Sequence, residues 1–170
     1  MKLNLKEIAV FGILGALMFA SKIVMEFLPN VHLIGVFVIS ITVVYRMKAL
    51  YPIYVFVVML GLFYGFDMWW VPYLYIWTLL WGAVMLLPKK LPNAIAPIIY
   101  ILLCGFHGFL FGTLYAPAQA VIFGMNFEKT VAWIISGLPF DLIHGVSNLV
   151  CGVLIIPLIK AMKTAQKYTS

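Results

Sequence analysis

Charged residues are scarce in this chain of 170 residues: they make up 9% of the sequence, whereas hydrophobic residues make up 65%. Soluble domains carry roughly 25% charged residues and at most about half apolar ones. A chain of this length cannot hide so many apolar side chains from water, because its surface is large relative to its volume. The composition therefore excludes an ordinary soluble domain. It predicts an integral membrane protein, organised as a single domain over residues 1–170.

The sequence also lacks the motifs of several enzyme classes. It has no glycine-rich phosphate loop, no His-Glu-x-x-His or Cys-x-x-Cys zinc pattern, and no Gly-x-Ser-x-Gly. Its two cysteines, Cys104 and Cys151, both lie in apolar runs, which argues against a disulfide framework. We therefore expect no enzyme activity, no metal and no cofactor. A less favoured alternative is an intramembrane hydrolase that uses Asp141 and His144.

The net charge of +6 does not indicate nucleic-acid binding, because the basic residues form short clusters between long apolar runs. If the N-terminus is cytoplasmic, the inner side holds Lys2, Lys6, Arg46, Lys48, Lys89, Lys90, Lys160, Lys163 and Lys167. The outer side then holds Lys129, with Lys22 near the outer end of the first helix, and four of the acidic residues fall in the outer half: Glu26, Asp67, Glu128 and Asp141. The positive-inside rule thus predicts that both termini are cytoplasmic.

Apolar segments long enough for membrane helices recur along the chain, since a spanning helix needs about 20 mostly apolar residues. Six candidates are predicted, at residues 6–28, 33–45, 50–66, 70–88, 93–114 and 131–160. The second is short and would span only if tilted or partly buried. The connection between Gly112 and Lys129 has an apolar middle, so it is expected to fold onto the membrane surface or to dip back into the protein. The predicted fold is an all-α membrane protein with six transmembrane helices and a ligand pocket in its outer half.

Small residues form a stripe on the first helix, at Ala9, Gly12, Ala16 and Ala20. Such a stripe allows another helix to approach closely. Two interpretations stay open from the sequence alone. The stripe is either an internal packing seam or a docking face for a different subunit.

Aromatic residues recur at helical spacing at the start of the fourth segment, at Trp70, Tyr73, Trp77 and Trp81. An interfacial aromatic belt would explain Trp69, Trp70 and Tyr73. The stripe continues deeper than a belt requires, and it could instead stack on a planar ring of a ligand.

The last segment carries Asp141, His144 and Asn148 on one helical face. Polar side chains in a lipid-embedded helix usually face the protein interior, so this face is predicted either to contact a ligand or to lock helices together. Pro139 is expected to kink or restart the helix, which would place Asp141 near a helix N-terminus. The outer loops add further polar residues, namely Asn30, His32, Asp67, Asn126 and Glu128. His107 is expected to be an ordinary buried histidine.

The chain resembles the S components of energy-coupling-factor (ECF) transporters over nearly its whole length. The resemblance rests first on Ala16-Leu-Met-Phe-Ala20, which matches the family's Ala-x-x-x-Ala motif on helix one. It also rests on the motifs Ser21-Lys22, Leu28-Pro29-Asn30, Tyr64-Gly65-Phe66, Trp69-Trp70 and Ser136-Gly137-Leu138-Pro139-Phe140-Asp141-Leu142-Ile143-His144. The family's metal-specific members begin with a Met-His segment, whereas this chain begins Met1-Lys2-Leu3, so metal transport is not expected.

The resemblance implies a multi-pass protein of the bacterial plasma membrane that captures a water-soluble vitamin or vitamin precursor from outside. It implies a transmembrane coupling subunit and two ABC ATPases as partners, with Gly12, Ala16 and Ala20 as the docking face, and toppling of the loaded subunit to release its ligand inside. The predicted ligand contacts are Asp141, His144, Asn148, Trp70, Tyr73 and Trp77, followed by Glu26, Asn30 and Asp67. A stand-alone secondary transporter is the main alternative.

Overall fold

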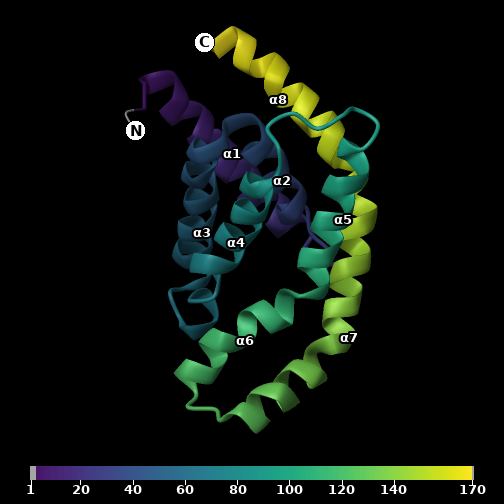
Figure 1. Ribbon diagram of the computed structural model, residues 1–170. Coiled ribbons are helices and arrows are strands. Elements are labelled where there is room, and N and C mark those ends of the chain that lie inside the picture. The colour runs from purple at the N-terminus through teal and green to yellow at the C-terminus, as the bar shows by residue number, and fades with distance from the viewer. Residues whose placement is uncertain (1–2, 170) are drawn as a thin grey trace.

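The computed structural model describes the backbone of residues 3–169 and the side chains of residues 3–166. Lys2 and the side chain of Lys167, which belong to the predicted inner set, lie outside the described part. Within it the chain is helical and contains no strand (Figure 1). The elements are α1 (Leu5–Val24), α2 (Ile34–Tyr45), η1 (Arg46–Ala49), α3 (Leu50–Tyr64), η2 (Met68–Trp70), α4 (Tyr73–Leu86), α5 (Ala96–Phe109), α6 (Phe111–Ile122), α7 (Phe127–Cys151), η3 (Gly152–Leu154) and α8 (Ile155–Thr169).

Five helical segments in the described part are long and apolar enough to cross a membrane. They are Leu5–Val24, Ile34–Tyr64, Met68–Leu86, Ala96–Ile122 and Phe127–Gln166. The structure thus agrees with the expected all-α architecture of a multi-pass membrane protein. The number of segments differs from the predicted six, because the predicted second and third segments fall within one continuous stretch.

That stretch, Ile34–Tyr64, reverses its direction at η1. Lys48 forms an ion pair with Glu7 at the start of α1, and the Tyr64 hydroxyl donates a 2.8 Å hydrogen bond to Glu26, just beyond the end of α1. The α3 helix therefore runs beside α1 in the same direction, and α2 runs the opposite way. Arg46, with a left-handed φ of 52°, lies at the reversal. The 12 residues of α2 make a helix about 18 Å long, which is shorter than the roughly 30 Å hydrocarbon core.

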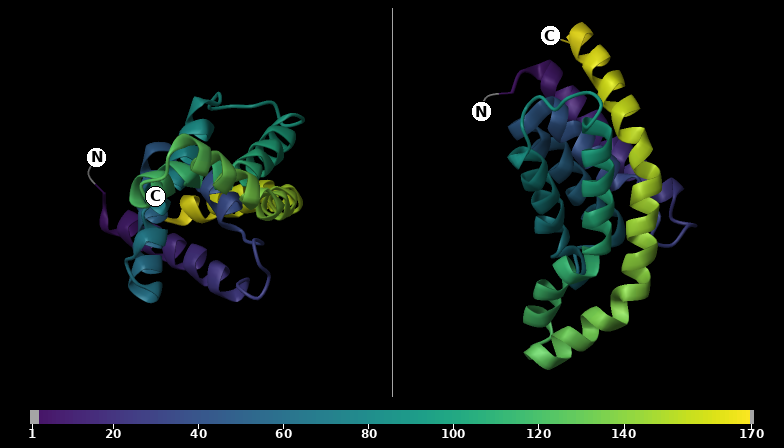
Figure 2. Two further views of the ribbon diagram at one scale, coloured as in Figure 1. Left: turned by 90° about the horizontal axis from the view of Figure 1, so that it is seen from below. Right: turned by 45° about the vertical axis from the view of Figure 1, so that its right-hand side comes forward.

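One end of the bundle collects the start of α1, η1, the α4–α5 connection and α8, together with both chain ends (Figures 1 and 2). We call it the basic end, and the opposite one the far end. Two hydrogen bonds join η1 to α4 here: Arg46 Nη2 donates to the Met85 carbonyl over 3.0 Å, and Trp81 Nε1 donates to the Arg46 carbonyl over 3.1 Å. The described basic residues that were predicted to lie on the cytoplasmic side of the membrane are therefore found at one end of the bundle.

Most of the predicted connection between Gly112 and Lys129 is helical. The helix break falls at Leu110, α6 follows directly and leads away from α5, and Gly124 turns the chain with a φ of 59° (Figure 1). The α7 helix then starts at Phe127, where the Asn126 side chain accepts a 2.9 Å hydrogen bond from the Lys129 N–H. This N-cap places the start of α7 four residues before the predicted position of 131.

Pro139 lies inside α7 and does not restart it. The helix is visibly bent and continues through Cys151 (Figure 1). The expectation that Asp141 follows a new helix N-terminus is therefore wrong, because the turn around Pro139 stays helical. Asp141 instead reaches a neighbouring N-terminus. Its Oδ1 accepts a 2.8 Å hydrogen bond from the N–H of Gly112, in the first turn of α6.

Helices α5 and α7 pack closely because glycines remove side chains at their crossing. A Cβ atom on Gly108 would lie 2.7 Å from Asn148 Nδ2 and 2.8 Å from the His144 carbonyl. A Cβ on Gly112 would lie 2.6 Å from Asp141 Oδ2. The polar face of α7 is thus pressed against α5 and the start of α6, on the inside of the protein.

Candidate functional site

A hollow of about 330 Å³ opens at the far end, between the ends of α1 and α3 and the start of α4. Its lining contains a lysine, a glutamate, a leucine and three aromatic side chains: Lys22, Glu26, Leu60, Tyr64, Trp69 and Tyr73. Small-molecule pockets typically have a mostly apolar, aromatic lining with a few polar groups, and they start at about 300 Å³. The far-end hollow therefore has the size and lining of a site for a small organic molecule.

The polar groups of the far-end hollow are held in place by each other. Glu26 accepts the hydrogen bond from Tyr64, and its other carboxylate oxygen lies 4.0 Å from Lys22 Nζ, one helical turn earlier. The hollow thus combines a cation and an anion side by side and has little net charge. Such a lining suits a ligand with both donors and acceptors better than a simple ion.

Tyr73 connects the far-end hollow to a buried cluster of rings. Its ring centroid lies 5.7 Å from that of Trp69 and 6.0 Å from that of Trp77, which is 1% exposed. Around Trp77 lie three imidazoles and one phenyl ring, and we call the whole set the aromatic–histidine centre: His32, Trp77, His107, Phe111 and His144. Tyr73 therefore belongs to the hollow on one side and to the centre on the other.

The hydrogen bonds of the centre assign the proton positions of two histidines. The Ile34 N–H donates to His32 Nδ1 over 3.3 Å, so the proton of the neutral His32 ring is on Nε2. This Nε2–H donates to His144 Nε2, which places the His144 proton on Nδ1. The two rings are nearly perpendicular, with centroids 4.4 Å apart. The arrangement requires that both imidazoles are neutral, because a proton on each facing nitrogen would repel.

His32 lies between α1 and α2, outside the segments that could span a membrane. Burial lowers the pKa of His32 well below its usual range, and the nearby His144, His107 and Lys22 lower this pKa further. The neutral form that the hydrogen bonds require is therefore the form expected at neutral pH.

Two buried nitrogens of the centre have no hydrogen-bond partner among the described residues, namely Trp77 Nε1 and His107 Nδ1. His107 donates through Nε2 to the Ile76 carbonyl over 3.3 Å, so its Nδ1 is an acceptor. Folded proteins leave few buried polar groups unpaired, and such groups are frequently functional. The centre thus offers one donor, on Trp77, and one acceptor, on His107. His107 is buried, as expected, but of its two ring nitrogens only Nε2 has a hydrogen-bond partner among the described residues.

Three of the residues predicted to bind a ligand lie on the inward face of α7, and they are all buried: Asp141, His144 and Asn148. His144 belongs to the centre. Asp141 caps α6, and Asn148 donates from Nδ2 to the Cys104 carbonyl over 3.2 Å. Each of these two also has one oxygen, Asp141 Oδ2 or Asn148 Oδ1, that finds no hydrogen-bond partner within the described part of the chain. The interpretation of this face as a lock between helices therefore describes Asp141 and Asn148, while their role as ligand contacts stays a prediction.

The remaining predicted contacts divide between the hollow and the loops. Tyr73 and Glu26 line the far-end hollow, and Trp77 lies behind it in the centre. The other three form hydrogen bonds outside the hollow. Trp70 Nε1 donates to the Val57 carbonyl over 2.8 Å, Asp67 accepts from the Met68 N–H over 2.6 Å, and the Asn30 carbonyl accepts from the Ser147 hydroxyl over 3.1 Å. The structure does not bring Trp70, Asp67 or Asn30 into the lining of the hollow.

The small-residue stripe of α1 lies on its outer face. Ala16 and Ala20 are exposed, and a Cβ atom on Gly12 would meet no atom within 4 Å. The helix instead packs on α3 through Gly15, where a Cβ would lie 2.5 Å from Val55 Cγ1. The stripe is thus not a packing seam within this chain, and a docking role for Gly12, Ala16 and Ala20 stays a prediction.

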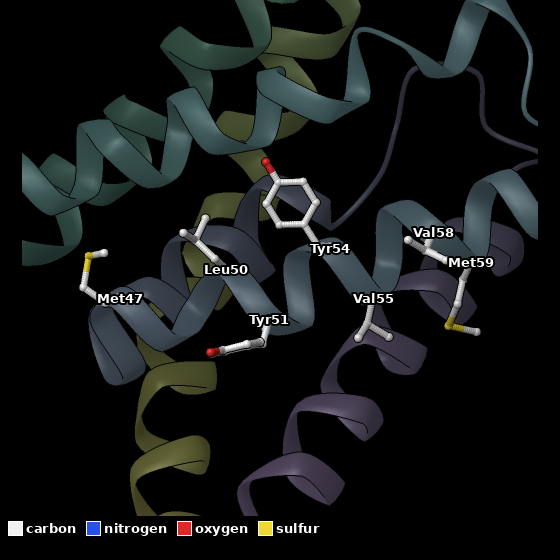
Figure 3. Close-up of a pocket in the computed structure, with 7 residues that line it drawn as sticks. All are labelled: Met47, Leu50, Tyr51, Tyr54, Val55, Val58 and Met59. Atoms are coloured by element: carbon white, nitrogen blue, oxygen red, sulfur yellow. The ribbon is translucent and has the colours of Figure 1, made fainter. Parts of the chain in front are cut away.

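A larger hollow of about 750 Å³ opens along α3 and contains none of the predicted ligand contacts. Figure 3 shows its lining, which comes from one stretch of chain: Met47, Leu50, Tyr51, Tyr54, Val55, Val58 and Met59. This lining is almost wholly apolar and lacks charged side chains. In a membrane protein such a groove suits acyl chains, so its size does not make it the better candidate for capturing a polar solute.

The sequence analysis did not single out seven residues of the hollow and the centre as ligand contacts: Lys22, His32, Leu60, Tyr64, Trp69, His107 and Phe111. His32 and His144 are 112 positions apart, and no local pattern links them. Among residues 3–166, no group of three or more histidine, cysteine or acidic side chains is arranged to hold a metal ion. The chain matches no protein-family model, no curated protein and no solved structure.

Proposed function

We propose that this chain is the substrate-binding S component of an ECF-type importer and that it captures a water-soluble vitamin or vitamin precursor from outside the bacterial plasma membrane. The observation that carries the proposal is the far-end hollow, with Tyr73 leading from it to the aromatic–histidine centre. Aromatic rings would enclose the planar or apolar part of the ligand. Lys22 and Glu26 would pair with its polar groups, and Trp77 Nε1 and His107 Nδ1 would serve any group that reaches the centre.

The proposed topology has six spans, with α2 and α3 counted separately because the chain reverses between them. Both termini and the basic end would face the cytoplasm, since positively charged loops are retained on that side. The far-end hollow would then face the external medium. The burial of α2 supports its assignment as a separate span despite its short length. It contributes Val38, Ile39 and Ile41 to the core, all with 0% exposure. A helix shielded by its neighbours does not need to match the bilayer thickness alone.

The proposed partners are a transmembrane coupling subunit and two ABC ATPases. Support comes from the outer face of α1, where Gly12, Ala16 and Ala20 leave room for the backbone of another helix. Ala16→Trp is expected to abolish uptake in cells that also express the coupling module, while ligand binding by the purified chain stays within about 2-fold of wild type. Leu17→Trp, also exposed on α1 but outside the stripe, is the matched control and should preserve uptake. Equal uptake by both variants would exclude the docking face.

The direct test is equilibrium binding of the purified chain to a panel of vitamins and precursors, with mass spectrometry of any ligand that co-purifies. We expect one class to bind, and Tyr73→Ala to weaken its binding by about 5-fold or more, since stacking on an aromatic ring contributes about 1 kcal/mol. Tyr54→Ala is the control. Tyr54 is a tyrosine of α3 that donates a hydrogen bond to the Leu74 carbonyl of α4 but does not line the far-end hollow. If no member of the panel binds, or if both variants bind as wild type does, the proposed site is wrong.

A stand-alone secondary transporter is the second candidate, and the His32–His144 hydrogen bond is the observation that favours it. Buried titratable side chains in membrane proteins often belong to proton pathways. Uptake driven by a proton gradient in vesicles that lack any ATPase, lost in His144→Gln, would favour this candidate over the importer subunit.

The intramembrane hydrolase finds no support in the hydrogen bonds of its proposed residues. His144 pairs with His32 and not with Asp141, and the Ser147 hydroxyl donates to the carbonyls of Asn30 and His144. A serine nucleophile needs its hydroxyl directed at a base.

A further inference from the structure

A second polar hollow, of about 440 Å³, lies at the basic end between the α4–α5 connection, the end of α2 and α8. Four lysines line it, two from the connection and two from α8: Lys89, Lys90, Lys160 and Lys163. We call it the lysine pocket. The two pairs come from segments far apart in the sequence, so the fold itself assembles this concentration of positive charge.

No acidic side chain of the described residues lines the lysine pocket. The chain has five acidic residues, and none of them lines it. The ion pairs found in the described part are Lys22–Glu26 and Lys48–Glu7, which lie elsewhere. Four ammonium groups around one hollow repel each other, and an anion bound between them would relieve that repulsion. The charge distribution thus indicates an anionic ligand.

The floor of the lysine pocket is apolar, with side chains from α2, α5 and α8: Val43, Ala96, Tyr100, Ile156 and Ile159. Two spanning segments meet the pocket at their ends, since Met68–Leu86 stops just before Lys89 and Ala96–Ile122 starts just after Asn93. The lysines therefore lie at the depth where the hydrocarbon core gives way to headgroups. A free inorganic anion would use the lysines and leave the apolar floor without a role.

We propose that the lysine pocket binds the headgroup of an anionic phospholipid, with the phosphate between the lysines and an acyl chain along the apolar floor. Basic pockets between membrane helices bind such headgroups in other proteins. Four lysines match a headgroup with two phosphates, as in cardiolipin, better than one with a single phosphate. A zwitterionic lipid adds its own cation and fits worst. This site is independent of the far-end hollow and of whatever solute that hollow takes.

The experiment titrates the delipidated full-length chain in detergent with cardiolipin, phosphatidylglycerol or phosphatidylcholine and measures bound lipid by native mass spectrometry. We expect affinity to fall in that order. K90Q/K163Q, which removes one lysine from each segment, should weaken cardiolipin binding by about 30-fold, given about a 5-fold effect per lysine near an anionic headgroup. K6Q/K129Q removes the same charge from exposed sites outside the pocket and should change binding by less than about 2-fold. K90R/K163R keeps the charge and should retain binding.

Three results would contradict a phospholipid headgroup in the lysine pocket. An equal loss in both glutamine pairs would mean that cardiolipin responds to net charge and not to the pocket. Equal binding of phosphatidylcholine would reduce the pocket to an apolar groove. Displacement of cardiolipin by millimolar inorganic phosphate would make it a free-anion site. Thermal unfolding of each variant in the same detergent checks the fold, which these exposed lysines are not expected to change.

Discussion

The two ends of the bundle use charge in opposite ways. At the far end, Lys22 and Glu26 face each other across one helical turn, and Tyr73, which lines the same hollow, contacts Trp77 of the buried aromatic–histidine centre. At the basic end, four lysines surround an apolar floor without any carboxylate in the lining. The first arrangement provides balanced donors and acceptors for a polar organic molecule, whereas the second provides a positive field. The same chain thus presents two sites that would select ligands of different charge.

The difference extends to burial. The aromatic–histidine centre lies deep in the protein, because Trp77 and the three histidines are almost completely buried. The lysines of the basic end stay exposed at the rim of their pocket. Substitutions in the aromatic–histidine centre should therefore disturb folding as well as binding, while substitutions of the four exposed pocket lysines should change lipid binding with little effect on stability.

The largest effect is expected when the central ring is removed. Trp77→Ala leaves a cavity among His32, His107 and Phe111, and it should lower the free energy of unfolding by about 3–5 kcal/mol. Trp81→Ala, on the same helix but half-buried near the basic end, should cost less than half as much. Thermal or denaturant unfolding in detergent measures both. Equal losses of unfolding free energy would contradict the claim that the aromatic–histidine centre contributes more stability than the packing at the basic end.

The cap that joins α7 to α6 should give the next largest effect. Gly112→Ala places a Cβ 2.6 Å from Asp141 Oδ2, displacing the carboxylate from the Gly112 N–H, and should cost about 1–3 kcal/mol of unfolding free energy. Gly137→Ala is the control, because its Cβ meets nothing within 4 Å and alanine favours the helix by up to about 1 kcal/mol. Opposite signs for the two variants are expected. A loss in both would mean that the destabilisation does not depend on the contact between Gly112 and Asp141.

The neutral state of His32 predicts a pH dependence of stability. Its pKa is lower in the folded protein than in the unfolded chain, so below about pH 6.5 the unfolded chain binds a proton that the folded protein excludes. The stabilising contribution is complete above that pH and is lost as the pH falls, by at most about 1.4 kcal/mol per pH unit. His32→Gln should flatten the profile between pH 7.5 and 5. Lys22, His107 and His144 face His32, and an unchanged slope in the variant would assign the dependence to the two other histidines.

The smallest effect is expected at the ion pair of the basic end. Glu7→Gln removes the partner of Lys48, and because both side chains are about one-third exposed, the loss of unfolding free energy should be the smallest of the four. High salt should reduce the difference from wild type further. A loss comparable to that of Trp77→Ala would show that the basic end depends on this pair for its packing.

The sequence predicted well what depends on local pattern. Apolar runs indicated the helices, and the period of α7 correctly put Asp141, His144 and Asn148 on one inward face. It failed where a helix boundary depends on contacts from elsewhere. Nothing near Leu110 marks the break between α5 and α6, and this break is secured by the Asp141 carboxylate at Gly112, 29 positions away. Pro139 suggested a restart, but the packing of α7 on α5 keeps the bent helix continuous.

By itself the sequence determined that the chain is helical, that several segments are apolar and long enough to cross a membrane, and that its basic clusters alternate with these segments. Those properties follow from hydropathy and helical period, which each segment carries regardless of its neighbours. Only the tertiary structure decided which side chains meet: His32 with His144, Tyr64 with Glu26, and the lysines of the α4–α5 connection with those of α8. These pairings depend on how glycine contacts and helix breaks orient one helix against another, and no local pattern encodes that orientation.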